Sequence, residues 1–257
     1  MLDWNPALYR RYEDERTRPA HDLLGRVPLA SAALAYDLGC GPGNSTELVA
    51  ARFPDARVVG IDNSQSMLAA ARERLPQLVF EMGDIAAWQP AAPPQLIFAN
   101  AALHWVPMHE ELLPRLLDML APGGVLAVQM PDNHEEPTHR LMRELAGEAP
   151  YAQAIGDVSH LRADLLSPQG YYDLLAPRAA RIDIWRTIYQ HPMDSPRAIV
   201  DWVRGTGLKP FIDRLSAELC SGFLAEYERR IGQAYLARTD GRRLLAFPRL
   251  FIVATRT

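Results

Sequence analysis

The sequence predicts an α/β protein built on a seven-stranded, mostly parallel, doubly wound sheet, with a helical cap over the carboxyl ends of the strands. Two observations carry this prediction. Short apolar runs bounded by Gly, Pro or Asp recur along the chain, as expected of buried strands. Segments of helical length separate the first five runs, and such alternation is typical of a parallel sheet with right-handed crossovers.

The predicted elements follow in chain order. Strands are predicted at Leu34–Leu38, Arg57–Ile61, Leu78–Met82, Gln95–Ala99, Val125–Met130, Ile182–Tyr189 and Leu250–Ala254. Helices of the alternating part are predicted at Ser45–Phe53, Ser64–Leu75 and Glu110–Leu120. After residue 131 the alternation ends, and helical patterns are separated by Pro and Gly. The longest of them predicts a helix from Phe211 to Ala237.

A single domain, residues 1–257, is expected at this length. Its core is predicted to comprise residues 30–130, 181–190 and 248–257. The other segments are expected to form a substrate cap over the open mouth of the sheet, because ligands bind at the carboxyl ends of parallel strands. These segments are residues 1–29, 131–180 and 191–247.

Charge and composition exclude several classes of protein. The net charge is −4 and the pI is near 6.0, so no basic surface for nucleic acid or membrane is expected. The same charge favours a small-molecule partner. No leader pattern and no run of roughly 18 apolar residues is present, which predicts a cytoplasmic protein. Cys40 and Cys220 are expected to be free thiols. No metal site is expected, because His134, Glu135 and His139 lack the order of a zinc motif.

The turn after the first strand is the most informative segment. Gly39, Gly41 and Gly43 stand at alternate positions. Without a Cβ, each glycine lets the backbone approach a ligand closely and adopt conformations that strain other residues. Asn44 or Ser45 is predicted to cap the helix that follows, whose free amides would face the ligand.

This turn differs from the dinucleotide fingerprint G-x-G-x-x-G. Thr46 stands where that fingerprint has its third glycine, and Pro42 removes a donor from a loop that would hold a pyrophosphate. With Asp37 two positions before the glycines, the turn instead resembles motif I of the class I S-adenosylmethionine-dependent methyltransferases. The resemblance covers residues 34–130 and implies a Rossmann-like fold, S-adenosylmethionine as cofactor and S-adenosylhomocysteine as product.

Acidic residues at the ends of the next two strands complete the predicted cofactor site. Asp62 lies about twenty residues beyond the glycines, where an acid meets ribose hydroxyls in nucleotide sites; alternatively, it caps the next helix. The resemblance implies that Asp84 accepts from the adenine amine and that Ile85 lies beside the ring, although Asp84 also suits an ordinary turn. Tyr12 is expected over the cofactor or in the core. The predicted cofactor-binding residues are Tyr12, Asp37, Gly39, Gly41, Gly43, Asp62, Asn63, Asp84, Ile85 and Asn100.

A narrower resemblance spans almost the whole chain. Its strings are Asp3–Tyr9, Asp14–Ala20, Asn100–Trp105, Trp202–Phe211 and Phe247–Ala254. Generic requirements of the fold would not dictate these strings, and together they resemble the trans-aconitate 2-methyltransferase family. The resemblance implies esterification of one carboxylate of this tricarboxylate, which gives the monomethyl ester and S-adenosylhomocysteine.

The implied reaction determines which residues are expected to matter. A carboxylate nucleophile is already ionised near neutral pH, so no general base is required and catalysis rests on alignment. His104 and Trp105 are expected at the methyl-transfer centre, where the superfamily places the residues after its fourth strand. Arg18, Arg204 and Lys209, the only lysine, are expected to bind the carboxylates of the substrate.

Plainer alternatives stand beside these roles. Arg18 would pair with a neighbouring acid, Arg204 would end a solvated helix, Lys209 would be a surface charge, and His104 would only order its loop. Two further functions also stay open. One is methylation of another carboxylate acceptor, such as a carrier-bound acyl chain; the other is a non-catalytic S-adenosylmethionine-binding protein or a dehydrogenase with a degenerate fingerprint.

Overall fold

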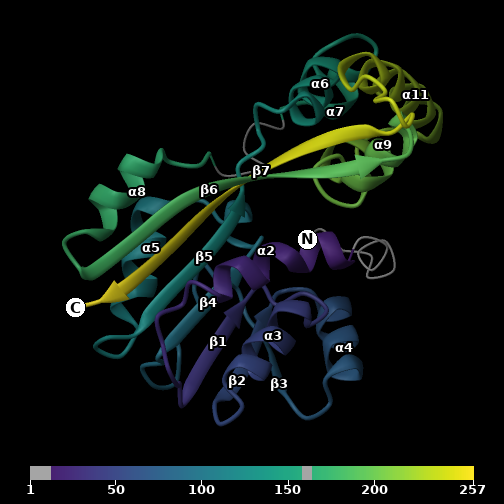
Figure 1. The fold of residues 1–257 in the computed structure, drawn as a ribbon. Helices are drawn as coiled ribbons and strands as arrows, with labels where there is room; N and C mark the ends of the chain where they lie inside the picture. Colours follow the sequence, from purple (N-terminus) through teal and green to yellow (C-terminus); the bar gives the residue numbers. More distant parts are fainter. Residues whose placement is uncertain (1–12, 158–163) are drawn as a thin grey trace.

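The computed structural model describes residues 13–157 and 164–257 and contains the predicted seven-stranded sheet (Figure 1). The strand order is β3-β2-β1-β4-β5-β7-β6. The first five strands are parallel, and β7 is antiparallel to both of its neighbours, so the prediction of a mostly parallel sheet is confirmed. The strands are β1 (Leu34–Leu38), β2 (Arg57–Asp62), β3 (Val79–Met82), β4 (Leu96–Asn100), β5 (Val125–Pro131), β6 (Ala179–Met193) and β7 (Arg243–Arg256).

The helices of the alternating part agree with their predicted positions to within two residues at each end. The described helices are α2 (Glu13–Leu24), α3 (Asn44–Arg52), α4 (Gln65–Arg74), η1 (Leu103–Trp105), α5 (His109–Asp118), α6 (Pro137–Ala146), α7 (Tyr151–Ile155), α8 (Pro168–Leu175), α9 (Pro196–Arg204), α10 (Lys209–Ile212) and α11 (Ala217–Ala234). None of these described helices combines the length and the apolar character that a membrane span requires.

One predicted helix is wrong in its extent. The long helix expected from Phe211 to Ala237 is broken, because α10 ends at Ile212 and α11 begins at Ala217. Ser216 stops a continuous helix from forming here. It has an extended backbone, and its Oγ accepts from the Leu219 amide as the N-cap of α11.

Helices cover both faces of the sheet, because successive strand residues point to opposite sides. Tyr36 and Leu38 of β1 share an apolar cluster with the buried side chains of α5 and α8. Ala35 belongs to the cluster on the other face, together with Leu23 of α2 and Val49 of α3. The alternation of side chains along β1 therefore determines which helices pack against each face of the strand.

The helices α6, α7, α9, α10 and α11 form a second unit, the helical lobe, with an apolar core of its own. Figure 1 shows that β6 and β7 run from the sheet into this lobe. Met193 of β6 and Phe247 of β7 are buried in the lobe core. Not all of residues 131–180 joins the lobe, since Tyr171 and Leu175 of α8 are buried in the sheet core beside α5.

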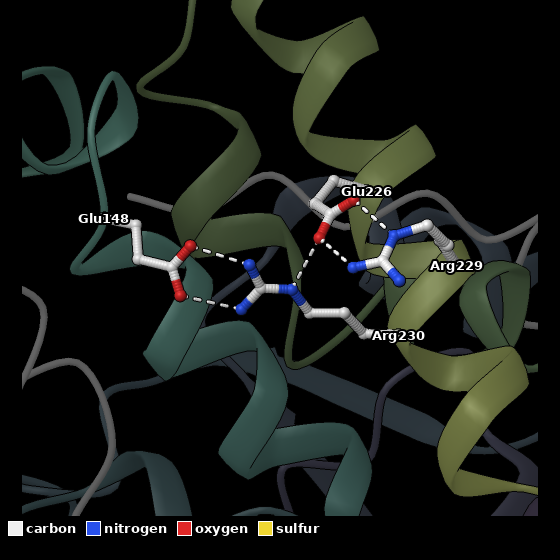
Figure 2. Close-up of polar contacts among 4 residues, drawn as sticks. All are labelled: Glu148, Glu226, Arg229 and Arg230. Atoms are coloured by element: carbon white, nitrogen blue, oxygen red, sulfur yellow. Dashed lines mark hydrogen bonds and ion pairs between the residues drawn. The ribbon is translucent and has the colours of Figure 1, made fainter.

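An ion-pair network ties α11 to the turn between α6 and α7 (Figure 2). Arg230 donates through Nη1 and Nη2 to Glu148 at 2.7 and 2.6 Å, and through Nε to Glu226 at 2.8 Å. Arg229 adds two bonds to Glu226. The hydrogen bonds from Arg229 and Arg230 lower the pKa of Glu226 to about 2. Glu148 and Arg229 are exposed, whereas Glu226 and Arg230 are half-buried, so salt will screen the network in part.

Candidate active site

The glycine loop leaves β1 and passes against the turn that follows β4. Gly39, Gly41 and Gly43 have φ angles of +71°, +54° and +93°, which favour glycine at each position. A Cβ on Gly39 would lie 2.3 Å from the Cβ of Ala102, whereas a Cβ on Gly41 would meet no atom within 4 Å. Packing therefore requires glycine at position 39, and at position 41 the loop leaves an open face for a ligand.

The start of α3 differs from its prediction. Gly43 is the N-cap and no side chain caps the helix, so neither Asn44 nor Ser45 has the predicted role. Instead, the Ser45 and Thr46 hydroxyls each donate to Oδ2 of Asp37 at 2.7 Å. Thr46, which replaces the third glycine of a dinucleotide fingerprint, thus joins α3 to β1 through Asp37.

Asp37 is fully buried beneath the loop. Burial raises its pKa to about 6; the hydrogen bonds from Thr46 and Ser45 oppose this shift, and the nearby charge of Asp62 adds to it. Its Oδ1 atom has no hydrogen-bond partner within the described part of the chain. Asp37 therefore has a structural role, because its hydrogen bonds hold the start of α3 against β1.

Asp62 links the glycine loop to the end of β2. Its Oδ2 accepts from the Gly41 amide at 2.9 Å, and its Oδ1 accepts from the Ser64 amide at 2.8 Å. Ser64, rather than Asp62, is the N-cap of α4. Burial raises the pKa of Asp62, and the backbone hydrogen bonds oppose this shift. The backbone of Asn63, an exposed residue, also hydrogen-bonds this carboxylate. Because a carboxylate has about four lone-pair sites, Asp62 can still accept from a hydroxyl donor.

The remaining predicted cofactor residues lie at neighbouring strand ends. Asp84 is exposed after β3, and its Oδ1 accepts from the Ala86 amide at 3.0 Å, as in an ordinary turn. Ile85 is buried, and a Cβ on Gly39 would lie 3.7 Å from its Cδ1. Asn100 ends β4, and its buried Oδ1 has no hydrogen-bond partner among the residues described. Tyr12 lies outside the described residues.

The turn between β4 and α5 carries the two residues predicted at the methyl-transfer centre. Ala101 has a φ of +54°, a strained value for a residue with a Cβ. Its amide donates to the carbonyl of Gln129 on β5 at 2.9 Å, which holds the turn in place. His104 is buried, and its ring centroid lies 4.7 Å from that of Trp105.

A cavity of about 320 Å³ lies between this turn and the helical lobe. Trp105 lines it from the turn, and His139 and Arg143 line it from α6. Gly207 and Phe211, both within the string that carried the narrower resemblance, line it from the segment around α10. Tertiary folding thus brings Trp105 to residues that lie more than thirty positions further along the chain.

Arg143 and His139 are site candidates that sequence reasoning missed. They lie four residues apart on α6, so they share one helix face. Arg143 Nη1 donates to the carbonyl of His134 at 2.6 Å, and the His139 ring hydrogen-bonds the Thr138 hydroxyl at 3.1 Å. The i, i+4 spacing of two basic residues was the available signal, but it does not say which face of a helix meets a cavity.

None of the predicted substrate-binding residues lines this cavity as the structure describes it. Lys209 is half-buried and makes an ion pair with Asp213 at 2.6 Å. Arg204 ends α9 and is half-buried. Arg18 is exposed on α2, with its guanidinium carbon 5.0 Å from the ring centroid of Tyr189.

A larger hollow of about 480 Å³ lies on the outer side of α5 and α8. Glu110, Glu111 and Asp118 contribute to its walls, together with Arg115 and Arg178. No predicted site residue lines it. Its acidic residues also make it a poor receptor for a polyanionic acid.

Comparison with known proteins identifies the family to which the chain belongs. The methyltransferase domain family matches residues 35–124. A trans-aconitate 2-methyltransferase of Variovorax paradoxus (strain S110) is 71% identical over 255 residues, which cover 99% of this chain and 98% of the relative. The chain belongs to the trans-aconitate 2-methyltransferase family. Family members from Methylobacterium radiotolerans and Yersinia pestis are 62% and 58% identical, again over 99% of this chain and 98% of theirs.

Solved structures share the fold at low sequence identity. The YcgJ protein of Bacillus subtilis is 14% identical with a TM-score of 0.58, over 93% of this chain and 98% of that one. Phosphoethanolamine N-methyltransferase 2 of Haemonchus contortus, in complex with phosphomonomethylethanolamine and S-adenosylhomocysteine, is 15% identical with a TM-score of 0.54, over 93% of this chain and 52% of that one. The predictions of the family and of its Rossmann-like fold are confirmed.

Proposed function

We propose that the protein transfers the methyl group of S-adenosylmethionine to one carboxylate of trans-aconitate, giving the monomethyl ester and S-adenosylhomocysteine. The observation that carries this proposal is the 71% identity to a trans-aconitate 2-methyltransferase across 99% of the chain. Because the match includes the helical lobe as well as the sheet, it covers the residues around the cavity and not only those of a shared cofactor fold.

The residues at the strand ends fit S-adenosylmethionine. The open face of Gly41 admits close approach, Asp62 has lone pairs for ribose hydroxyls, and Asp84 offers an exposed carboxylate. The buried, orphaned Oδ1 of Asn100 is an acceptor suited to the ammonium group of the methionyl part. When bound, the cofactor supplies an electrophilic methyl group. Tyr12, Asn63 and Ile85 are proposed to complete the site.

The cavity beside Trp105 is the proposed acceptor site, and the helical lobe is its substrate cap. A volume of about 320 Å³ suits a small acid. Arg143 and His139 supply N–H donors for its carboxylates. The Nη1 atom of Arg143 already donates to the carbonyl of His134 and Nη2 pairs with Glu135 at 3.3 Å, so a substrate carboxylate would replace Glu135 at Nη2. Arg204 and Lys209 lie on the α9–α10 segment that lines the cavity and remain proposed contributors to its charge.

Catalysis in this site rests on alignment and on exclusion of water. The attacking carboxylate needs no general base, so Trp105, which lines the cavity, acts as a wall that orients the acid and displaces water from it. His104 packs against the ring of Trp105 and is proposed to position it. Buried His104 is also proposed to order the turn, because its ring packs against that of Trp105.

A direct assay tests the proposed reaction. The protein is incubated with S-adenosylmethionine and millimolar trans-aconitate, and the monomethyl ester is sought by mass spectrometry. No turnover would refute the assignment. Methylation of a carrier-bound acyl chain in its place would establish the alternative acceptor.

The acceptor site is tested with two arginines of the same helix. Arg143→Gln is expected to raise the KM for trans-aconitate by about tenfold or more, because a charge-assisted hydrogen bond is lost, with little change in the affinity for S-adenosylhomocysteine. Arg140→Gln is the matched control, since Arg140 is exposed beside Glu144 and does not line the cavity. Equal KM values for the two variants would remove Arg143 from substrate binding.

A further inference from the structure

Basic side chains gather outside the cavity, where α2, β5, β6 and β7 meet. Arg249 of β7 is 4% exposed, and its Nη1 donates to Oε1 of Gln129 on β5 at 3.1 Å. Its guanidinium carbon lies 4.7 Å from the ring centroid of Phe247. Arg18 of α2 covers the ring of Tyr189, which pairs with Phe247 across β6 and β7. Two arginines therefore approach one stretch of the strand pair.

His191 of β6 lies within this cluster and is 6% exposed. Its ring centroid is 6.3 Å from that of Tyr189 and 6.1 Å from that of Phe247, the two rings that the arginines cover. Its Nε2 atom is buried and has no hydrogen-bond partner within residues 13–157 and 164–257. A buried imidazole nitrogen without a partner calls for an explanation, and a ligand is one.

Gln129 provides a second observation of the same kind. The Oε1 atom of Gln129 accepts from Arg249. This contact identifies the second terminal atom of the side chain as the amide nitrogen Nε2, which is a donor. This Nε2 is buried and finds no acceptor in the described part of the chain. A buried donor beside an arginine is suited to an anion, since both would point N–H groups at the same acceptor.

The charges around His191 favour an anion as well. The facing charged groups are Arg249 on β7, Arg18 on α2, and Asp22 on α2, which accepts from the Tyr189 hydroxyl at 2.5 Å. From α9 the ring of Trp202, which is neutral, packs against His191 at 4.8 Å. Burial lowers the pKa of His191 to about 4, and the charges of Arg249 and Arg18 act in the same direction. A bound anion would reverse this effect.

We infer that Arg249, Gln129 and His191 form a carboxylate-binding subsite beside the methyl-transfer centre, an inference that rests on the proposed function. Gln129 pairs with Asn100 across β4 and β5, and its carbonyl holds the amide of Ala101 in the turn that carries His104. The proposed reaction offers two carboxylates that this subsite could bind. One belongs to the acceptor acid, and the other to the amino-acid group of the cofactor.

Calorimetry on Arg249→Gln separates these two sources. Trans-aconitate is titrated into protein saturated with S-adenosylhomocysteine; S-adenosylhomocysteine and 5′-methylthioadenosine, which lacks the amino-acid group, are titrated into free protein. The variant is expected to lose about tenfold to a hundredfold in affinity for the carboxylate ligand, and to bind methylthioadenosine normally. Arg181→Gln is the control, because Arg181 is an exposed arginine of β6 at the opposite end of the strand.

Each result has a distinct meaning. Loss for trans-aconitate alone identifies the acceptor as the ligand, and loss for S-adenosylhomocysteine alone identifies the cofactor. Normal affinity for both in the folded variant would overturn the subsite. If the wild-type protein binds no trans-aconitate, the proposed function fails, and the S-adenosylhomocysteine titration still decides whether the subsite exists.

NMR of His191 in the wild-type protein tests the subsite even if the Arg249→Gln variant does not fold. The imidazole resonances of His191, assigned by their loss in His191→Gln, are followed by NMR at about pH 5.5, above its pKa of about 4. Saturating trans-aconitate or S-adenosylhomocysteine is expected to shift them toward the protonated form, because a neighbouring carboxylate raises the pKa. Resonances that stay at neutral positions with both ligands would overturn the inference.

Discussion

Replacing Gly39 by alanine tests the close approach on which the glycine loop depends. At φ +71° a Cβ costs about 1–2 kcal/mol of backbone strain. The new methyl group would also lie 2.3 Å from the Cβ of Ala102, which no rotamer change can move, so overpacking adds about 1–3 kcal/mol. Gly39→Ala is therefore expected to lower the free energy of unfolding by about 2–5 kcal/mol.

Gly41→Ala is the matched control within the same loop. Its φ of +54° carries the same backbone strain, but its Cβ would meet no protein atom within 4 Å, so a loss of only about 1–2 kcal/mol is expected. Urea denaturation measures the free energy of unfolding of both variants. Calorimetry measures their affinity for S-adenosylhomocysteine, which is expected to be lower in Gly41→Ala. Equal losses of stability would refute the packing argument for Gly39, and unchanged ligand affinity in Gly41→Ala would refute the open face.

Two further predictions concern the carboxylates of Asp62 and Asp37, which lie at the glycine loop. Asp62→Ala is expected to weaken S-adenosylhomocysteine binding strongly while circular dichroism stays unchanged; undiminished affinity would remove Asp62 from the ribose role. Asp37→Asn is expected to alter how stability depends on pH. Burial raises the Asp37 pKa from 3.8 to about 6, so the stability it contributes is fully present below pH 3.8 and is lost as the pH rises through 6, in total about 3 kcal/mol at about 1.36 kcal/mol per pKa unit. Urea denaturation from about pH 4 to pH 7 should show this fall in the wild type and not in the variant, and parallel curves would contradict the assignment.

Local signals predicted the sheet well because each strand of the first half carries its own pattern. The run from Leu34 to Leu38 alternates between two faces, and both faces are covered in the structure. The two C-terminal strands were found but placed too short. Beyond the predicted bounds, β6 and β7 continue through polar residues such as Gln190 and Arg243, which interrupt the apolar run that marks a strand.

The candidate site was predicted unevenly for a physical reason. Residues of the glycine loop and the strand ends follow from their position along one strand–turn–helix unit, so local sequence places them. The acceptor side depends on contacts between distant segments, such as Trp105 with Phe211 across one cavity. Arg143, which lines this cavity, was therefore not predicted, whereas Lys209, which does not line it, was.

By itself, the sequence determined the α/β fold, the methyl-donor loop and the family, because glycine positions, apolar runs and long matching strings are properties of neighbouring residues. Tertiary structure alone decided that Thr46 and Ser45 bind Asp37, that α6 turns Arg143 toward Trp105, and that Arg249, Gln129 and His191 share one buried cluster. These outcomes depend on how helices and strands far apart in the chain pack against one another, and no local pattern records that packing.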